Sequence, residues 1–153
     1  MTTTITMSSS PVIHRAGQAP KLDVFGVTVR PLVGGDFTEG HCAIAHIECR
    51  PGEDAPLHRH RHGEAFFVLS GLVRVRCDDT TTVLGPGDFV AIPPWAAHTF
   101  GNVGTEVATL INVGTPAGHD LFFRDADALA RSGKFSPETA AELCRRHDIE
   151  LVM

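Results

Sequence analysis

The chain has little of several things that would define its class. Its 153 residues include no tyrosine and one tryptophan, and the net charge is -5. Without tyrosine, a mechanism that needs a tyrosine base is excluded, and the lack of a basic excess argues against binding to nucleic acid. No apolar run approaches the ~20 residues that span a bilayer, and the N-terminus lacks the basic start and apolar core of a signal peptide. We therefore expect a cytoplasmic protein that binds neither nucleic acid nor membrane.

Cysteine is also scarce and widely spaced. The four cysteines form no C-x-x-C pair, so neither a cysteine-type zinc site nor a redox pair is indicated. In a reducing compartment such residues are more often small buried hydrophobic side chains than disulfides. We expect them to be reduced and buried.

Glycine and proline, by contrast, are frequent and occur throughout the chain. The 15 glycines and 10 prolines separate short runs of β-branched and aromatic residues. From Val24 onward these runs recur at roughly eight-to-twelve-residue spacing, which favours an antiparallel sandwich or barrel. In the strand predicted for residues 41–49, alternate residues from Ala43 onward form one apolar face that we expect to be buried.

These patterns divide the chain into three segments. Residues 1–20 are rich in threonine and serine, and we expect a flexible N-terminal arm there. Residues 21–118 carry the predicted strands. From residue 119 the apolar spacing becomes helical, and Ser136 before Pro137 marks the start of a second helix. The result is one β domain with a helical extension over residues 119–153.

The stretch with the clearest chemistry covers residues 56–71, P-L-H-R-H-R-H-G-E-A-F-F-V-L-S-G. At alternate positions it carries three histidines and a glutamate: His58, His60, His62 and Glu64. Alternate side chains share one face if the segment is extended. Imidazole and carboxylate groups are ligands for first-row transition metals, so this face predicts a metal site.

Two motifs in this region resemble those of the cupin superfamily. The first, G-x5-H-x-H-x3-E-x6-G, is complete and runs from Gly52 to Gly71. The second, G-x5-P-x-G-x2-H-x3-N, runs from Gly87 to Asn102, but Trp95 stands where the family usually has its second glycine. We expect this departure to affect the turn before the motif's histidine rather than the histidine itself.

The resemblance implies an all-β fold, a single-domain jelly-roll barrel that holds one divalent transition metal. Carried over onto the matching positions, the ligands are His58, His60, Glu64 and His98, and Glu64 also serves as a catalytic base. This donor set does not distinguish iron, manganese, nickel, cobalt, copper or zinc. His62 falls between the family's ligand positions, and we expect it either to contact the ligands from outside the metal site or to lie at the rim of the pocket.

Residues at alternate positions from the predicted ligands should share their face and line a pocket beside the metal. Four residues share the parity of a predicted ligand and a fifth lies near the expected mouth: Phe66, Val68, Phe100, Asn102 and Trp95. Plain core packing explains the phenylalanines equally well. An apolar pocket with a metal at its base suits a small organic substrate.

Three functions fit these features. The first, which we favour, is a metal-dependent dioxygenase, because the chain resembles the quercetin-dioxygenase-like cupins. The second is a non-redox Lewis-acid enzyme, an isomerase, lyase or polyketide cyclase, in which the metal polarises a carbonyl. The third is a non-catalytic module in which the metal anchors a ligand. The missing tyrosine disfavours the cupin enzymes that use a tyrosine base or a cysteine–tyrosine crosslink.

The resemblance also implies a partner. Cupin barrels commonly pair through their sheet faces and N-terminal arms, and the arm predicted over residues 1–20 is suitable for this. We therefore expect a homodimer that takes a small-molecule substrate.

Overall fold

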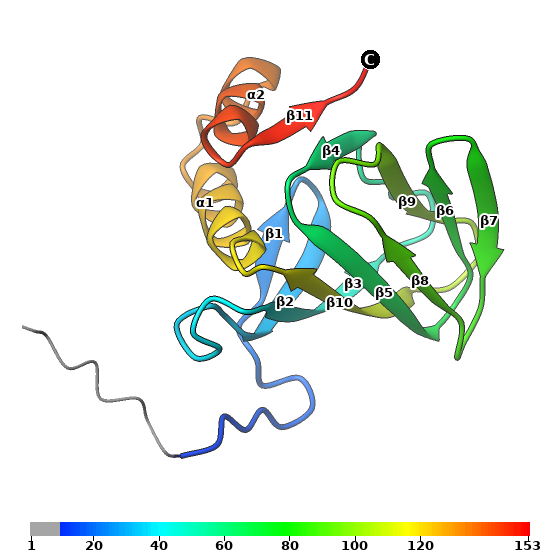
Figure 1. Ribbon diagram of the computed structural model, residues 1–153, viewed down its shortest axis with the longest axis horizontal. Helices are drawn as coiled ribbons and strands as arrows, with labels where there is room; N and C mark the ends of the chain where they lie inside the picture. Colours follow the sequence, from blue (N-terminus) through cyan, green and yellow to red (C-terminus); the bar gives the residue numbers. More distant parts are fainter. Residues whose placement is uncertain (1–9) are drawn as a thin grey trace, which may run out of the picture.

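The computed structural model describes residues 10–153, so part of the predicted N-terminal arm lies outside the described residues. Two antiparallel β-sheets face each other, and two short helices pack at one end of them (Figure 1). The predicted all-β jelly-roll fold is confirmed. The strands form two separate sheets rather than one closed cylinder.

The elements follow the chain in a regular order. In sequence they are β1 (Leu22–Val24), β2 (Val27–Val33), β3 (Ala43–Cys49), β4 (His58–His60), β5 (Gly63–Ser70), β6 (Val73–Cys77), β7 (Thr80–Leu84), β8 (Phe89–Ile92), β9 (His98–Asn102), β10 (Ala108–Thr115), α1 (His119–Arg131), α2 (Pro137–Arg146) and β11 (Ile149–Leu151). The six-stranded sheet has the order β1-β2-β3-β10-β5-β8, and the five-stranded sheet has the order β11-β4-β9-β6-β7.

Local sequence accounts for several of these boundaries. The predicted inner face of β3 is buried at every alternate residue from Ala43 to Cys49. β8 ends at Ile92, because the two prolines that follow have no N–H to donate to a ladder. Ser136 caps α2 by accepting a hydrogen bond from the Thr139 backbone, as predicted.

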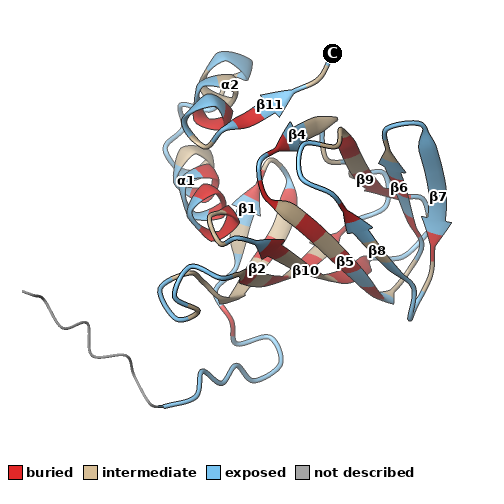
Figure 2. Ribbon diagram, viewed as in Figure 1, coloured by how far each residue is buried: buried red, intermediate tan, exposed pale blue. Residues whose placement is uncertain are grey.

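One hydrophobic core joins the sheets to the helices. Leu110 of β10 is fully buried between the sheets, and Phe122 of α1 and Leu143 of α2 belong to the same buried cluster. Figure 2 shows buried positions on the sides of both helices that face the strands. The apolar stripes of the helices therefore pack inward, and β11, which the sequence did not predict, returns to pair with β4.

The cysteines are unpaired. All four are free, and Cys49 and Cys144 are buried, whereas Cys42 and Cys77 are only partly buried. The expectation of free thiols is confirmed, while that of full burial holds for two of the four.

The outer face of the six-stranded sheet is partly apolar. Phe67 of β5 and Phe89 of β8 lie directly opposite each other and are 42% and 60% exposed. The homodimer stays a prediction, and this is a surface that it could use. Among residues 10–153 no helix is both long and apolar enough to cross a membrane.

Candidate metal centre

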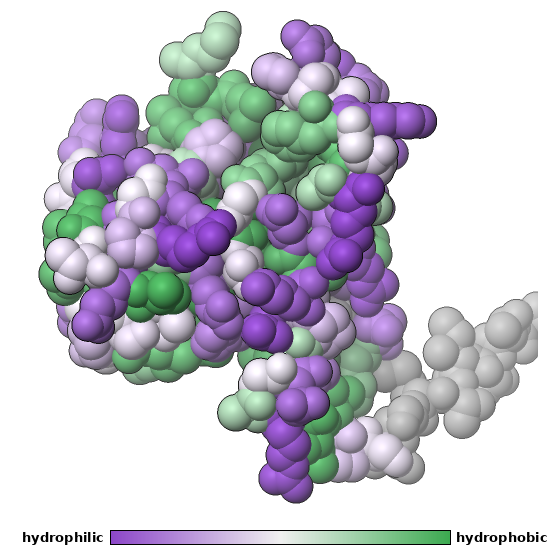
Figure 3. Space-filling model, turned by 180° about the vertical axis from the view of Figure 1, so that it is seen from behind, coloured by the Kyte–Doolittle hydropathy of each residue, from purple (hydrophilic) through white to green (hydrophobic). Residues whose placement is uncertain are grey.

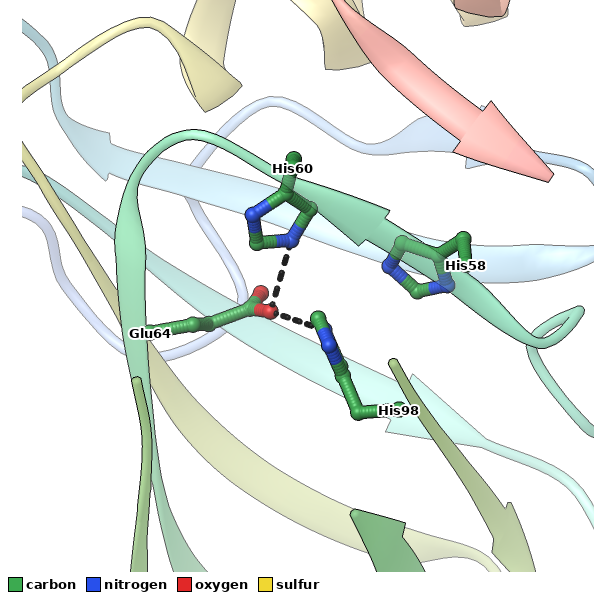
Figure 4. Close-up of side chains that lie close together, drawn as sticks. All are labelled: His58, His60, Glu64 and His98. Atoms are coloured by element: carbon green, nitrogen blue, oxygen red, sulfur yellow. Dashed lines mark hydrogen bonds and ion pairs between the residues drawn. The ribbon is translucent and has the colours of Figure 1, made fainter. Parts of the chain in front are cut away.

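The histidine-rich stretch forms the site, but not as one strand. β4 ends at His60, residues 61–62 form a bend, and β5 begins at the next residue. His58 and His60 thus belong to the five-stranded sheet, whereas Glu64 belongs to the six-stranded sheet. The condition of one extended segment is therefore not met. The side chains still converge, because the bend carries the chain from one sheet to the other (Figure 4).

The fourth predicted ligand comes from a neighbouring strand. His98 is the first residue of β9 and lies directly opposite His58 of β4. The structure brings all four predicted ligands together, with one ligand atom of each within 4.8 Å of the others: His58, His60, Glu64 and His98. Figure 4 shows Glu64 between the two sheets, facing His60 and His98.

Backbone carbonyls fix the tautomer of each histidine in this group. Each contact joins an Nδ1 atom to a carbonyl oxygen two residues away: His58 to Pro56 (2.6 Å), His60 to His62 (2.9 Å) and His98 to Ala96 (2.9 Å). A carbonyl oxygen only accepts, so each Nδ1 must carry the hydrogen. Each Nε2 then presents a lone pair, as a metal-ligating histidine does when its other nitrogen donates to a carbonyl.

Two of these lone pairs face a carboxylate. Glu64 Oε2 lies 3.2 Å from His60 Nε2 and 2.8 Å from His98 Nε2. An acceptor nitrogen and an acceptor oxygen repel each other at this distance unless a proton or a cation lies with them. A mixed set of imidazole nitrogens and a carboxylate oxygen is suited to a divalent transition metal. The residues present therefore fit the metal that the cupin resemblance implies.

The charges of the site follow from burial and from these contacts. Burial works to raise the pKa of Glu64, but the imidazoles of His119, His60 and His98 lower it more strongly, so its carboxyl stays ionised. Burial likewise works to lower the pKa of His98, but its hydrogen bond to Glu64 and the charge of that carboxylate raise it overall. A proton on His98 can therefore take the place of a cation when none is bound.

Two side chains complete the surroundings of Glu64, and neither was predicted from the sequence. Asn112 Nδ2 donates to Glu64 Oε1 over 2.7 Å, and His119 Nε2 lies 3.5 Å from the same oxygen. Asn112 follows Ala108 and Leu110 on the buried face of β10, so a polar residue in an apolar alternation was the available signal. No comparable signal pointed to His119, because its position depends on how α1 packs.

An apolar cavity of about 70 Å³ lies beside the candidate ligands. Its walls are mostly hydrophobic side chains from β1, β2, β3, β9 and the C-terminal segment: Val24, Phe25, Val27, Val29, Ile47, Phe100, Phe122, Phe123, Cys144, Ile149 and Leu151. At the ligand end the lining includes His58, Glu64 and His119. Figure 3 shows apolar surface at the end of the molecule where the C-terminal segment lies. The helical extension thus covers the pocket, a point that the sequence left open.

The residues predicted by parity to line the pocket are placed differently. Phe100 lines the cavity, but Phe66 and Val68 are only 1% and 0% exposed and lie in the core beneath it. The Asn102 side chain donates to two backbone carbonyls and so holds loops together. The prediction that these residues line the pocket is therefore corrected. Alternation along a strand shows which face a side chain is on, but not how far it lies from the site.

Trp95 keeps the turn that the family usually builds with glycine. Its φ is 66°, in the left-handed region that favours glycine, and its N–H donates to the His60 carbonyl over 2.8 Å. The side chain is 48% exposed and lies beside residues of α2 and β11, outside the walls of the apolar cavity. The departure from the motif therefore leaves the turn and His98 in place.

His62 contacts the candidate ligand His60 from outside the predicted ligand set, which is one of the two positions expected for it. It is 8% exposed, and its Nε2 is hydrogen-bonded to Nδ1 of His119. His60, His62 and His119 also lie close enough together to hold a metal. However, the rings of His60 and His62 stack with centroids 4.0 Å apart and planes 13° from parallel. Stacked rings direct their nitrogens side by side rather than toward a common point.

Comparison with known families agrees with the fold and the motifs. Residues 45–114 match the family described as "Cupin domain". This match covers β3 to β10 and includes all four candidate ligands. The match, the jelly-roll fold and the two motifs together support membership of the cupin superfamily.

Individual relatives are more distant. The chain is 32% identical over 98 residues to the alginate biosynthesis protein AlgA of Pseudomonas aeruginosa, which covers 62% of this chain and 20% of that protein. It is 24% identical over 115 residues to quercetin 2,3-dioxygenase of Bacillus subtilis, covering 74% of this chain and 34% of the relative. An RmlC-like cupin from Shewanella frigidimarina superposes with a TM-score of 0.63 at 24% identity, over 73% of this chain and 96% of the other. The chain thus spans about a fifth of AlgA and a third of the dioxygenase.

The buried histidines give the metal-free protein a pH-dependent stability. Burial lowers the pKa of His58 and His62 to about 4 and that of His119 to about 3, from an ordinary value of 6.5. Below pH ~6.5 the unfolded chain binds protons on these groups and the folded chain does not. The free energy of unfolding is therefore expected to fall as the pH is lowered from ~6.5 toward ~4, by up to about 1.4 kcal/mol per pH unit for each histidine.

Two other groups modify this slope. The lowered pKa of Glu64 adds a loss of stability only once the pH falls below its ordinary value of 4.5. The raised pKa of His98 has the opposite sign, because its contribution is full below pH 6.5 and is lost as the pH rises through its folded pKa. Urea unfolding at pH 7, 6 and 5 with a chelator present measures the sum. A free energy that is flat or rises on acidification would contradict the burial of neutral histidines.

Proposed function

We propose that this protein is a metal-dependent enzyme acting on a small organic molecule, and that its reaction is a dioxygenation of the quercetinase type. The observation that carries the proposal is the convergence of imidazole lone pairs and one ionised carboxylate at the end of an apolar cavity. The distant similarity to quercetin 2,3-dioxygenase supports the choice of reaction, at 24% identity over 115 residues.

The metal would be held by His58, His60, Glu64 and His98. When bound, it would supply a centre that orients an oxygen-bearing substrate and activates it toward dioxygen. Four protein ligands leave up to two positions of an octahedral site for other molecules. The protein's own part is to keep the three Nε2 lone pairs and the carboxylate in this arrangement before substrate arrives.

Other side chains bind the substrate and handle its proton. Phe100, Phe122 and Phe123 provide apolar walls that take up the hydrocarbon part of a substrate and keep water away from the ligands. Glu64 is ionised and lines the cavity, so it is placed to accept a proton from an enolic hydroxyl of the substrate. The buried amide of Asn112 holds the other carboxylate oxygen, which keeps Glu64 in place during this transfer.

The size of the cavity limits the substrate. At about 70 Å³ it is well below the ~300–1,000 Å³ that is typical of sites for drug-sized ligands. A short enolisable diketone therefore suits this cavity better than a flavonol with three rings.

Oxygen uptake tests the proposed reaction. Protein loaded in turn with iron(II), manganese(II), nickel(II) or copper(II) is mixed with 2,4-pentanedione or with quercetin in an oxygen electrode. We expect at least one metal form to consume oxygen and diketone in equal amounts, and to act on the diketone faster than on quercetin. Metal-free protein is expected to be inactive. The His41→Ala variant, which changes an exposed histidine outside the site, is the matched control and is expected to keep full activity.

The same assay separates the other functions. Conversion of a carbonyl substrate without oxygen uptake would contradict the dioxygenase and favour a Lewis-acid isomerase, lyase or cyclase, in which Glu64 moves the proton. Binding of a ligand that is recovered unchanged would contradict both enzymes and favour a binding module.

A further inference from the structure

His119 connects the C-terminal segment to the metal centre. It is the first residue of α1 and follows the last residue of the cupin family match by five positions. Its side chain is 6% exposed and packs edge-on against the ring of Phe123, with centroids 4.8 Å apart. Its two nitrogens face different partners, Nδ1 facing His62 Nε2 and Nε2 lying 3.5 Å from Glu64 Oε1.

The partners determine the direction of these contacts. An ionised carboxylate only accepts, so a neutral His119 faces it favourably only with its hydrogen on Nε2, 3.5 Å from Glu64 Oε1, a polar contact longer than an ordinary hydrogen bond. His119 Nδ1 then carries a lone pair and can only accept, so His62 donates to it from Nε2. His62 therefore orients the His119 ring through a hydrogen bond, and His119 in turn presents the hydrogen on its Nε2 to Glu64 across a 3.5 Å contact. The opposite direction would leave a nitrogen lone pair facing the carboxylate.

The two carboxylate oxygens of Glu64 therefore have different partners. Oε1 is held by the Asn112 amide at 2.7 Å and faces His119 at 3.5 Å. Oε2 is left facing the nitrogens of His60 and His98 at 3.2 and 2.8 Å. A carboxylate restrained through one oxygen presents the other as a single donor, and restraint of this kind raises the affinity of a metal site.

We propose that His119, oriented by His62, is a positioning residue that holds Glu64 with Oε2 directed to the metal. The inference rests on the metal centre of the proposed function. It makes α1, which lies outside the cupin family match, a part of the metal site rather than only a cover over it. His119 acts through Glu64 and is not itself a metal ligand in this role.

Two substitutions of His119 separate hydrogen bonding from packing. The His119→Phe variant keeps a ring against Phe123 but has no donor, whereas His119→Gln keeps an N–H that can reach Glu64. The control is Phe123→Leu, which disturbs the packing around His119 without changing a donor. Far-UV circular dichroism and thermal unfolding of the metal-free forms show whether each variant folds.

Cobalt(II) provides the readout without any assay of activity. The affinity is measured by competition with a chromophoric chelator, and the visible absorption of bound cobalt reports its ligand geometry. We expect His119→Phe to weaken cobalt binding about 10- to 100-fold and to change the visible spectrum. His119→Gln is expected to restore most of the affinity and the wild-type spectrum, and Phe123→Leu is expected to leave both unchanged.

Each outcome decides a different claim. Wild-type affinity and spectrum in His119→Phe would overturn the inference while the metal centre stands. An equal loss in Phe123→Leu would also overturn it, because the effect would then be one of packing. A wild-type chain that binds no cobalt would overturn the proposed metal centre, and the inference with it. If His119→Phe does not fold, His62→Leu provides a second test, because it removes the hydrogen-bond partner that orients His119. Unchanged cobalt binding in His62→Leu would count against the proposal.

Discussion

Replacing His98 by alanine is expected to lower the affinity for a divalent transition metal by more than about 100-fold, the upper end of the loss seen when only an outer partner of a ligand is removed. The substitution removes one of the two Nε2 lone pairs that face Glu64 Oε2. The His98 nitrogen lies 2.8 Å from this oxygen, and the remaining His60 nitrogen lies 3.2 Å from it. Metal content after dialysis and competition with a chelator measure the loss. Oxygen uptake with the diketone is expected to disappear in parallel.

The controls for this experiment separate ligand loss from unfolding. His98 is 1% exposed, so its removal also leaves a small void in the core. His98→Gln fills more of that volume but supplies a poor ligand, and it is expected to lose metal as His98→Ala does. His41→Ala alters an exposed histidine and is expected to bind metal like the wild type. Tight stoichiometric binding by both His98 variants would contradict the ligand assignment.

Replacing Leu143 by alanine is expected to lower the free energy of unfolding by about 2–5 kcal/mol. Leu143 lies on α2 and is 1% exposed, and it belongs to the same buried cluster as the strands of both sheets. Truncating it removes apolar contacts and leaves a cavity that the surrounding side chains fill only in part. Urea unfolding at pH 7 measures the change.

The matched control lies on the neighbouring helix. Leu121 of α1 is 54% exposed, so Leu121→Ala is expected to change the free energy of unfolding by no more than about 0.5 kcal/mol. Similar small effects from both substitutions would mean that the C-terminal helices dock loosely. The larger effect at Leu143 would show that they fold with the sheets as one unit.

The sequence predicted the elements of the site whose spacing is local. In β3 the alternation from Ala43 to Cys49 was enough to assign the buried face, because a strand has a strict two-residue period. The motif spacing likewise selected His58, His60 and Glu64, which lie within seven positions of one another and converge in the structure.

The features of the site that the sequence did not predict depend on contacts between residues far apart in the sequence. Whether His58 to Glu64 forms one strand or two is decided by which sheet each half joins, and periodicity carries no information on that. His119 lies 57 positions from its partner His62. Its place beside Glu64 follows from the packing of α1 against the sheets. Phe66 and Phe100 have the parity expected of pocket residues, yet only Phe100 lines the cavity.

The pairing of β4 has a consequence for the order of events during protein synthesis. Only one residue pair joins β4 to β9, whereas three join it to β11. Arg59 of β4 is bonded to Glu150 of β11, which the ribosome adds 91 positions later. The histidines of the first motif therefore leave the ribosome long before their strand has its main partner. Loading of the proposed metal into its finished site therefore belongs after translation of β11, and the identity of that metal would reflect what the cell offers once β11 has been made.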